Sequence, residues 1–577
     1  MIWGSFHDHL VVFLRIAGKK SGDANKQAAA TAKKQQAAEN AKRRGAEAEA
    51  AANAKKREAE AAANAKKREL QSKKQMAAPG TTDISPTIAN GYNVRDYDWL
   101  HSVKDCPVYK PSFAEFEDPF QYIQSIAKEA SEYGICKIIP PFPPSKTANV
   151  ILSTDFKFKT TVQPLQANNG QIVYEEGRMR TLAQFEVQAN KFMAARYANS
   201  IMIPPRLLEI DFWHELLRIK QSQVEYGINI EGSGFSGLLD DALASSAWNL
   251  KTFSKLPKCL LRHVERPIKG VTEPMMYIGM LFGTFAWHVE DNYLYSINYH
   301  HCGAPKTWYG VPGKQATLLE EIAEKEIFNN QFQWEVTSQE TNGANILAKK
   351  TTMFPPNMLQ DHGVMVSRAT QLCGEFIVTF PRAYHAGFSN GFNIGEAVNF
   401  APYDWIDFGN LAARNYARSG ISSIVSCDQI IFKECISFDR DTLTDAEREL
   451  AIHFGISLSL HKVARSCLYQ SPPQGFDTIQ KDDNIVLCTN CGRDCFFSYV
   501  IHEDSSDPIC LLHDWSRFKG CKLYLHQDIK EIENKQSELF KKDNQLVQQV
   551  QDALHDIAIT TANKWLLKFM VNVVVSL

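Results

Sequence analysis

The sequence predicts a mixed, mainly β protein: a β-rich core followed by a helical region and a small metal-binding segment. Three observations predict this fold class. Short runs rich in β-branched and aromatic residues fill about 250–400, helical spacing follows over 402–470, and Cys and His residues crowd together at 488–521. With 577 residues the chain is long enough for roughly two to four units, some without a core of their own.

The composition is that of an ordinary globular protein. Apolar residues make up 44% of the chain and charged residues 22%, which excludes a collagenous or wholly disordered protein. The net charge of −2 gives no argument for nucleic-acid binding by the chain as a whole. The 13 Cys are mostly scattered singly, as in a reduced compartment, and the crowded ones favour metal over disulfides.

The first 96 residues form a basic, Ala- and Lys-rich extension. The sequence AEAAANAKKRE occurs twice in tandem, at 48–58 and 59–69, and eleven residues make three helical turns. Equivalent residues of the two repeats would therefore lie on nearly the same face of a helix, and no large apolar residue recurs there. Two interpretations stay open: a solvated helix or disordered linker, and a KKR-rich segment for nuclear import or nucleic-acid contact. The apolar runs near both chain ends are broken or short, so no membrane association is expected.

Residues 97–144 predict one small βα-type element. Helical apolar spacing runs from Phe120 to Glu132, the strand-like ICKII follows, and prolines end it. The element is too short to be stable alone, so we expect it to pack on the segments C-terminal to it. Residues 145–247 are expected to form a linking segment.

The main domain is expected at 248–415. Runs such as YIGMLFGTFAW, LYSINYHH, TWYGVP, EFIVTF and NIGEAVNFA predict short buried strands, several of them separated by Gly, Pro or Asn. A helical region is expected at 416–480, a zinc finger at 481–527, and an amphipathic helix with a tail at 528–577. The apolar residues of that helix are Ile529, Ile532, Leu539, Leu546, Val550, Leu554 and Ile557.

The segment AWHVEDN carries the candidate chemistry. Two residues apart in a strand pattern, His288 and Glu290 leave the same face, and His385 follows another buried strand. Two His and one carboxylate on one face of an octahedron leave open positions, as in Fe(II) oxygenases. An H-x-E pair alone also arises by chance on solvated strands. Here the apolar neighbours make a metal or a cation necessary to offset the buried carboxylate.

These residues carry a resemblance to a known family. The segments FAWHVEDNYLYSINYHHCGAPKTWYGVPG and FPRAYHAGFSNGFN resemble the JmjC domain of histone lysine demethylases, and CPVYKPSFAEFEDPFQYI with YGICKIIPP resembles JmjN. The residues of these segments are most similar to those of plant JmjN/JmjC proteins, and the resemblance extends over about 100–415. The resemblance implies a double-stranded β-helix (jelly-roll or cupin) core that holds Fe(II) through His288, Glu290 and His385.

The resemblance also implies the cofactor and substrate contacts. It places the far carboxylate of 2-oxoglutarate on Lys306 and Tyr226, with Asn298 and Phe285 lining the pocket. A lysine is a suitable point charge for a carboxylate end, although Lys306 alone also fits a surface turn. The methylated ammonium is expected beside Tyr277, Ala397 and Asn399, together with Glu290. Tyr277 and Asn399 also fit a purely packing role.

The implied reaction consumes O₂ and 2-oxoglutarate and hydroxylates an N-methyl group, which releases formaldehyde and succinate. The expected partners are the histone H3 tail and the nucleosome, in the nucleus. The resemblance suggests di- or trimethylated lysine 9 of H3, with lysine 27 a rival. A JmjC protein hydroxylase and a non-catalytic chromatin-binding scaffold remain the alternatives.

The Cys/His segment predicts a zinc site. The pairs Cys488-x2-Cys491 and Cys510-x2-His513 offer three thiolates and an imidazole, a tetrahedral Zn(II) set. The resembling family interleaves a second set, which departs from pattern here. The residues near its expected places are Cys495, His502, Asp504 and Cys521. Cys495 fits either a ligand or a buried thiol, so a second zinc stays a candidate only.

Overall fold

The structure is a computed structural model. It describes residues 93–146, 151, 156–165, 172, 174–197, 203–217, 222–238, 240–328, 343–470, 478–481, 486–513, 521–541 and 543–560. All of them belong to one compact unit, Ile84–Leu577. The tandem basic repeat and the apolar runs near the two chain ends lie outside the described residues.

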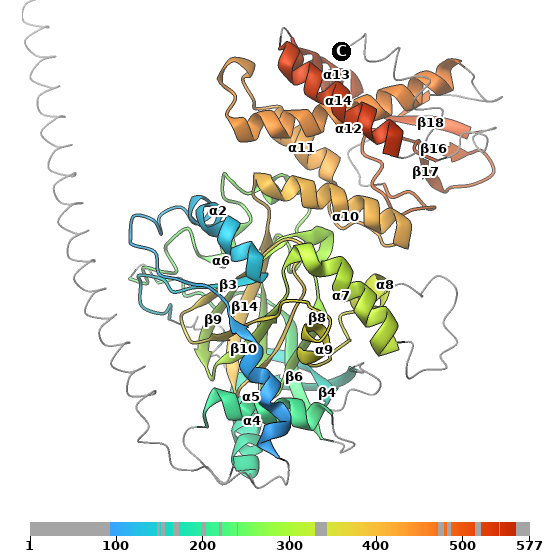
Figure 1. Cartoon of the computed structure of the whole chain (residues 1–577). Coiled ribbons are helices and arrows are strands. Elements are labelled where there is room, and N and C mark those ends of the chain that lie inside the picture. Colours follow the sequence, from blue (N-terminus) through green and yellow to red (C-terminus); the bar gives the residue numbers. More distant parts are fainter. Residues whose placement is uncertain are drawn as a thin grey trace, which may run out of the picture. The chain divides into compact units, whose positions relative to one another are not determined.

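Two sheets form the core, which confirms the predicted mainly-β fold and fits a jelly roll (Figure 1). A five-stranded sheet has the order β1-β11-β10-β13-β8, and a nine-stranded sheet has the order β2-β3-β12-β9-β14-β7-β6-β4-β5. The strands of the predicted main domain are β7 (Met275–Gly279), β8 (Thr284–His288), β9 (Tyr295–Gly303), β10 (Lys306–Gly310), β11 (Ser367–Gln371), β12 (Phe376–Thr379), β13 (His385–Ser389) and β14 (Asn393–Phe400).

The first described part of the chain contributes to both sheets. After the 3-10 helix η1 (Val94–Ser102), β1 (Lys104–Asp105) pairs with β11, while β2 (Val108–Tyr109) and β3 (Ile135–Ile138) extend the other sheet beside β12. Between them lies α2 (Pro119–Ala130), which the Asp118 carboxylate caps by accepting from two backbone N–H groups. The expectation that this small element packs on later segments of the chain is confirmed.

The predicted linking segment is itself part of the nine-stranded sheet. Its strands β4 (Lys157–Pro164), β5 (Glu175–Thr181) and β6 (Gln223–Glu231) continue the sheet, because β6 pairs with β7. The helices α4 (Leu182–Tyr197) and α5 (Pro205–Leu216) stand between β5 and β6. Weak periodicity in this stretch hid the strands, whose outer members are largely exposed.

Short helices interrupt the strands of the main domain. They are α6 (Leu250–Phe253), η3 (Leu260–His263), η4 (Asp291–Tyr293), η5 (Gly313–Gln315), α7 (Ala316–Ile322), the π-helix η6 (Ala323–Phe328), α8 (Gly343–Ala348) and α9 (Asn357–Gln360). The stretch from about 313 to 360, predicted as part of an all-β core, is therefore helical where it is described.

The C-terminal part is helical, as predicted, and also contains a small sheet that was not predicted. Its helices are η7 (Tyr403–Trp405), α10 (Ile406–Ser419), α11 (Cys427–Cys435), η8 (Arg440–Thr442), α12 (Asp445–Gln470), α13 (Ile529–Phe540) and α14 (Asn544–Thr560). The prediction of a single amphipathic helix near the C-terminus is wrong, because two helices form there. The backbone becomes extended at Lys541, which ends α13. The Asp543 carboxylate then accepts from Leu546 N–H and caps α14.

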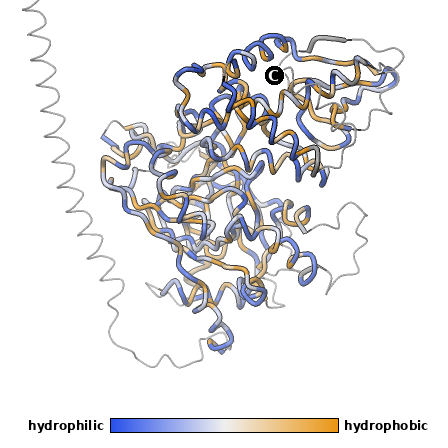
Figure 2. Tube along the Cα trace, turned by 45° about the horizontal axis from the view of Figure 1, so that its top comes forward, coloured by the Kyte–Doolittle hydropathy of each residue, from blue (hydrophilic) through white to orange (hydrophobic). Residues whose placement is uncertain are grey.

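The small sheet has the order β15-β18-β16-β17 and carries the Cys/His segment. Its strands are β15 (Thr478–Lys481), β16 (Ser498–His502), β17 (Pro508–Cys510) and β18 (Cys521–His526). Apolar residues of this sheet, of α11 to α14 and of the nine-stranded sheet share one buried cluster. Apolar and polar stretches alternate along the strands and helices accordingly (Figure 2).

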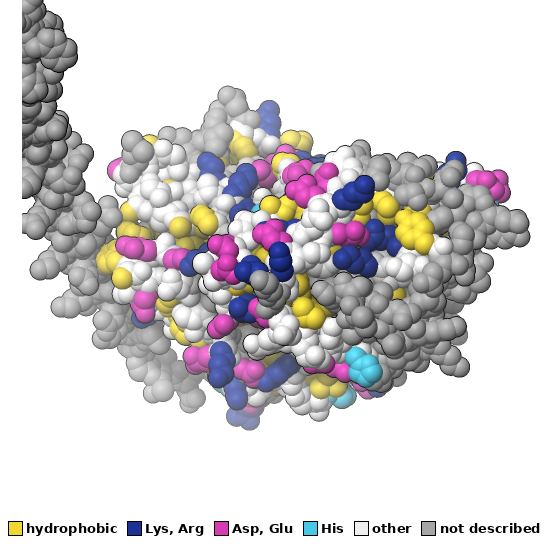
Figure 3. All heavy atoms as spheres, turned by 90° about the horizontal axis from the view of Figure 1, so that it is seen from above, with side chains coloured by type: hydrophobic (Ala, Val, Ile, Leu, Met, Phe, Trp, Pro, Cys, Tyr) yellow, Lys and Arg dark blue, Asp and Glu magenta, His cyan; other side chains and the backbone are white. Residues whose placement is uncertain are grey.

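Basic and acidic side chains are intermingled on the face seen in Figure 3. Among the described residues no helix has both the length and the apolar character that crossing a membrane requires.

Candidate functional site

Strand pairing brings the two predicted histidine ligands together. His288 ends β8 and His385 begins β13, and the two residues stand directly opposite each other in the antiparallel pair. Their ring centroids lie 4.2 Å apart. Glu290 lies beyond the end of β8 rather than inside the predicted strand, yet its backbone stays extended, so its side chain returns to the same face.

The three side chains form a compact ligand set. One ligand atom from each of His288, Glu290 and His385 lies within 4.8 Å of the others, and Glu290 Oε1 stands 3.5 Å from His385 Nε2. The His385 side chain is 2% exposed and that of Glu290 17% exposed, so the site opens toward solvent on the carboxylate side. Two imidazoles and a carboxylate in this arrangement fit Fe(II) with open positions.

Backbone carbonyls fix the orientation of both imidazoles. His288 Nδ1 lies 2.8 Å from the Ala286 carbonyl oxygen, and His385 Nδ1 lies 3.0 Å from that of Ala383. A carbonyl only accepts, so each Nδ1 carries the proton and donates it. Each Nε2 therefore keeps its lone pair for a metal, the usual support for a ligating histidine.

The charge states of the site also suit a metal. Burial, and after it the neighbouring His385, lowers the pKa of His288 to about 3, so its imidazole is neutral near pH 7. Burial raises the pKa of Glu290, but the two facing histidines, His385 before His288, favour its ionised form and bring that pKa well below its ordinary value. The set therefore presents one anion and a neutral His288 imidazole.

The turn after Glu290 is held by residues from the helical region. Asn292 is fully buried and has a φ of +50°, which is rare outside glycine. Its N–H donates to Tyr416 Oη at 2.9 Å, and its side-chain oxygen accepts from Ile424 N–H at 3.0 Å. Trp405 Nε1 donates to its carbonyl at 3.0 Å. These three bonds over-determine a strained turn next to a metal ligand.

Lys306 lies at the start of β10, inside the core. It is 5% exposed, its Nζ donates to Tyr226 Oη at 3.3 Å, and no carboxylate in the described part of the chain pairs with it. Nζ also stands 5.7–5.9 Å from the ring centroids of Tyr226, Tyr277 and Phe285. Burial lowers the pKa of Lys306 to about 8. A buried ammonium without an anion is costly and fits a carboxylate ligand.

Glycine at position 395 keeps the space under Lys306 open. A Cβ added to Gly395 would stand 3.5 Å from Lys306 Nζ. Gly395 belongs to β14 and is paired with Tyr277 of β7. Any larger side chain would extend toward the ammonium and narrow the room for a ligand there.

The remaining predicted cofactor residues lie on neighbouring strands. Phe285 is on β8, and its ring centroid lies 4.5 Å from that of Trp308. Asn298 is on β9, where its side-chain amide donates to Ser296 Oγ at 3.3 Å. Both residues are only partly buried, as wall residues of an open pocket would be.

His300 was missed by the sequence reasoning. It lies two positions beyond Asn298 on β9, on the same face, and is fully buried. Neither ring nitrogen has a hydrogen-bond partner in the described part of the chain. Burial, and after it the charge of Lys306, lowers its pKa to about 3, so a neutral imidazole stands near the ammonium. The alternation from Asn298 to His300 was the available signal.

The predicted substrate residues flank the same region. Tyr277 Oη donates to Asn229 Oδ1 at 3.2 Å, and the Asn399 amide donates to the Tyr295 carbonyl at 3.1 Å. Ala397 is paired with Asn298 on one side and Met275 on the other. Asn399 is 6% exposed, so its amide satisfies a backbone group and its contact with a ligand is an expectation only.

The four predicted zinc ligands converge. The ligand atoms of Cys488, Cys491, Cys510 and His513 all lie within 4.8 Å of one another. Cys488 Sγ stands 3.2 Å from His513 Nε2, and Cys491 Sγ stands 3.9 Å from Cys510 Sγ. Gly492, with φ +65°, makes the tight turn after the first pair. Three thiols and one imidazole fit tetrahedral Zn(II).

The second candidate set does not converge in the same way. The groups of metal-ligating side chains found among the described residues do not include Cys495, His502 or Cys521. The Cys495 thiol donates to the Arg493 carbonyl at 3.7 Å, and His502 stands opposite Cys521 across β16 and β18. Cys495 is fully buried, which agrees with the interpretation as a buried thiol.

Comparisons with known domains agree with this geometry. Residues 275–400 match the JmjC domain, described as a hydroxylase domain, and residues 107–140 match the jmjN domain. The expected JmjC and JmjN elements are thereby confirmed. The zinc finger rests on the ligand geometry.

Curated plant proteins are similar over larger parts of the chain. Lysine-specific demethylase JMJ706 of Oryza sativa subsp. japonica is 40% identical over 482 residues, 78% of this chain and 55% of the relative. Lysine-specific demethylase JMJ705 of the same plant is 36% identical over 59% of this chain and 29% of its own length. Lysine-specific demethylase REF6 of Arabidopsis thaliana is 33% identical over 58% of this chain and 28% of its own length. The chain thus spans about half the length of these relatives, or less.

Proposed function

We propose that this chain, which carries a JmjN and a JmjC domain, is an Fe(II)- and 2-oxoglutarate-dependent oxygenase that demethylates lysine in histone H3. The single observation that carries the proposal is the conjunction of a His-Glu-His ligand set with a buried lysine that no carboxylate among the described residues pairs with. A metal site alone fits many chemistries. A metal site beside an unpaired buried ammonium fits a dicarboxylate cofactor.

Iron would be held by His288 Nε2, His385 Nε2 and the Glu290 carboxylate. The carbonyl oxygens of Ala286 and Ala383 accept from the two Nδ1–H groups, so neither histidine needs to change tautomer to bind iron. The ionised carboxylate offsets part of the metal charge. The open side of the set, toward Glu290, leaves room for cofactor and substrate.

The far carboxylate of 2-oxoglutarate would bind Lys306 Nζ and Tyr226 Oη, and Phe285 and Asn298 would line its path to the metal. When bound, iron and 2-oxoglutarate supply oxidation of an N-methyl group by O₂, with succinate and formaldehyde as products. The protein residues position these groups and exclude water. Lys306 also neutralises the carboxylate in a site of low dielectric, where the ion pair is strong.

The methylated lysine would lie beside Tyr277, Glu290, Ala397 and Asn399. The Tyr277 ring offers an aromatic face to the ammonium, and the small Ala397 leaves space for methyl groups. We place the substrate at di- or trimethylated lysine 9 of H3, with lysine 27 as the second candidate, on the resemblance to plant JmjN/JmjC proteins. The protein would act on H3 tails of nucleosomes in the nucleus, where the basic extension of residues 1–96 offers a nucleic-acid contact.

The test is peptide demethylation by the purified full chain. H3 peptides trimethylated at one lysine each are incubated with Fe(II), ascorbate and 2-oxoglutarate, and mass spectrometry records the loss of methyl groups while formaldehyde is quantified. We expect His288→Ala to abolish turnover and His362→Ala, at an exposed histidine, to leave it unchanged.

Other outcomes would replace the proposal. Undiminished formaldehyde release by His288→Ala would remove the iron assignment. A gain of one oxygen on a peptide without loss of methyl would identify a JmjC hydroxylase instead. Binding of H3 peptides without 2-oxoglutarate turnover would identify a non-catalytic scaffold.

A further inference from the structure

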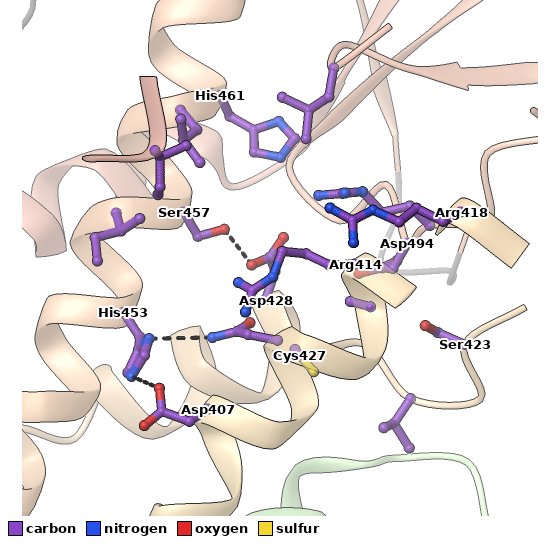
Figure 4. A pocket seen from close by; sticks show the side chains of 18 residues that line it. Asp407, Arg414, Arg418, Ser423, Cys427, Asp428, His453, Ser457, His461 and Asp494 are labelled. Atoms are coloured by element: carbon purple, nitrogen blue, oxygen red, sulfur yellow. Dashed lines mark hydrogen bonds and ion pairs between the residues drawn. The ribbon is translucent and has the colours of Figure 1, made fainter. Parts of the chain in front are cut away.

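A cavity of about 640 Å³ lies away from the iron site, between α10, α12 and the Cys/His segment (Figure 4). Its volume is that of a site for a small ligand. Its walls come from α10, from residues 423–428 that lead into α11, from α12, and from the loop after Cys491. Neither the iron site nor the zinc set uses it.

Three arginines line the cavity. Arg414 and Arg418 are four residues apart on α10 and therefore share a face, and Arg493 comes from the Cys/His segment. None of the three guanidinium groups makes an ion pair or a side-chain hydrogen bond within the described part of the chain. Arg493 Nε is buried without a partner. Burial of a donor without an acceptor is costly, so an acceptor is expected from outside.

The acidic side chains of the same walls are already engaged elsewhere. Asp407 Oδ1 stands 3.2 Å from His453 Nε2, Asp428 accepts from the Ser457 hydroxyl, and Asp494 accepts from the Ser426 hydroxyl. Figure 4 shows Asp407 and His453 at one end of the cavity and Arg418 at the other. Asp428 and Asp494 lie closer to the arginines in this view, but no carboxylate in the described part of the chain forms an ion pair with Arg414, Arg418 or Arg493.

The charged groups of the cavity also act on one another. Burial, and after it the charges of Arg493 and Arg418, lowers the pKa of Arg414, and Asp407 opposes this shift only in part. Burial raises the pKa of Asp428, so this carboxyl carries negative charge less readily than an ordinary one. The guanidinium groups thus repel one another, and an oxyanion among them relieves the repulsion.

Part of the cavity lining is apolar. It is formed by Val425, Ile456, Leu460, Leu512 and Ile557. A bare inorganic anion would leave this surface uncovered. A ligand with an apolar body attached to its charged head would cover it and add the hydrophobic contribution of the buried area.

We propose that this cavity binds a phosphate monoester, with its dianionic head among Arg414, Arg418 and Arg493 and its apolar body on the Val-Ile-Leu wall. Planar guanidinium groups match phosphate oxygens in pairs, and three of them suit a group with three free oxygens. The ester is either a free small molecule or a phosphorylated aromatic side chain of a peptide. Both carry the same chemistry.

Calorimetric titration of the full-length, zinc-loaded protein tests the proposal. Phenyl phosphate is the main probe. Inorganic phosphate is the probe that lacks an apolar body, and a phosphotyrosine tetrapeptide is the probe for a peptide source. We expect phenyl phosphate to bind at least tenfold more tightly than inorganic phosphate. Binding of the tetrapeptide with equal affinity would assign a peptide source, and its failure to bind would assign a small molecule.

Arg414→Gln and Arg493→Gln should each weaken phenyl phosphate binding at least tenfold. Arg440→Gln, at an arginine already bonded to Asp441, is the matched control and should bind as the unmodified protein does. Zinc content and melting temperature report whether each variant is folded. Arg418→Gln, at an exposed position on α10, gives a variant that does not touch the zinc segment. No binding of phenyl phosphate, or equal binding by all variants, would overturn the proposal.

Discussion

At the scale of single residues, the site depends on a few buried polar groups that the described part of the fold leaves without a full set of hydrogen-bond or charge partners. Lys306 has only the Tyr226 hydroxyl, and His300 has no partner for either ring nitrogen within the described part of the chain. A core normally pairs such groups. Their lack of partners indicates where a ligand belongs, and it does so without any reference to the metal set.

The depressed pKa of Lys306 predicts a pH dependence for cofactor binding. Because 2-oxoglutarate binds the ammonium form, its affinity should be constant below pH about 8 and fall by up to tenfold per pH unit above that value. Lys306→Met should weaken binding by about 100-fold at pH 7, since it removes a buried charge partner. Titration of 2-oxoglutarate at several pH values measures both effects.

Lys306→Arg is the control for this pH dependence, because arginine stays charged over the whole range. A pH-independent affinity in the unmodified protein would contradict the role of Lys306. The same depressed pKa makes the cofactor-free fold gain stability from this group as pH rises from about 8 toward 10.5, because the unfolded chain then binds more protons than the folded one.

At the scale of elements, the turn of η4 depends on hydrogen bonds from another region. Tyr416 and Trp405 belong to α10 and η7, and Ile424 follows α10. All three bond Asn292, two residues from Glu290. The helical region therefore does more than cover the sheets: it positions a metal ligand.

Asn292→Ala should weaken Fe(II) binding by roughly 10- to 100-fold, the usual cost of losing an outer partner of a metal ligand. Tyr416→Phe should have a smaller effect in the same direction. Metal titration of the purified apo-protein measures this directly. Asn249→Ala, which removes the cap of α6 away from the iron site, should lower the melting temperature without changing iron affinity. Unchanged iron affinity in Asn292→Ala would contradict the positioning role.

The converging cysteines predict a structural zinc in the small sheet. Elemental analysis of purified protein should give about one zinc per chain, and Cys510→Ser should remove it. Because structural zinc contributes folding free energy, chelation should increase hydrogen exchange over 486–513 and 521–526. Strands β8 and β13 should stay protected. Normal protection of the small sheet after loss of zinc would contradict a structural role.

At the scale of the whole molecule, the basic extension is expected to be separable from catalysis. Deletion of residues 1–90 keeps every residue that we assign to the iron site and should leave kcat on an H3 peptide within about twofold. Binding to nucleosomes should weaken and its salt dependence should decrease, since Lys and Arg that contact phosphate are lost. Loss of peptide turnover in the truncated protein would place the domain boundary elsewhere.

The sequence predicted the β core and the metal-ligand set better than it predicted the contacts between distant segments that hold them together. Strand alternation predicted His288 and Glu290 on one face, whereas Lys306 and the place of His385 in the set came from the resemblance to JmjC domains. The bonds of Asn292 and the strands of 157–231 depend on contacts between distant segments, which leave no local pattern. The break at Lys541 was missed because the apolar spacing continues through it.

The pairing of β1 to β3 with β11 and β12 also constrains how the protein is made. Lys137 and its partner Thr370 are 233 residues apart, and β3 leaves the ribosome long before β12 exists. At ordinary rates of synthesis that interval is roughly 10–50 s. During this time the apolar strand Ile135–Ile138 has no sheet to join. We therefore expect chaperones to bind the nascent N-terminal half early, because the first strands of the sheet gain their partners only when the late strand β12 has been made.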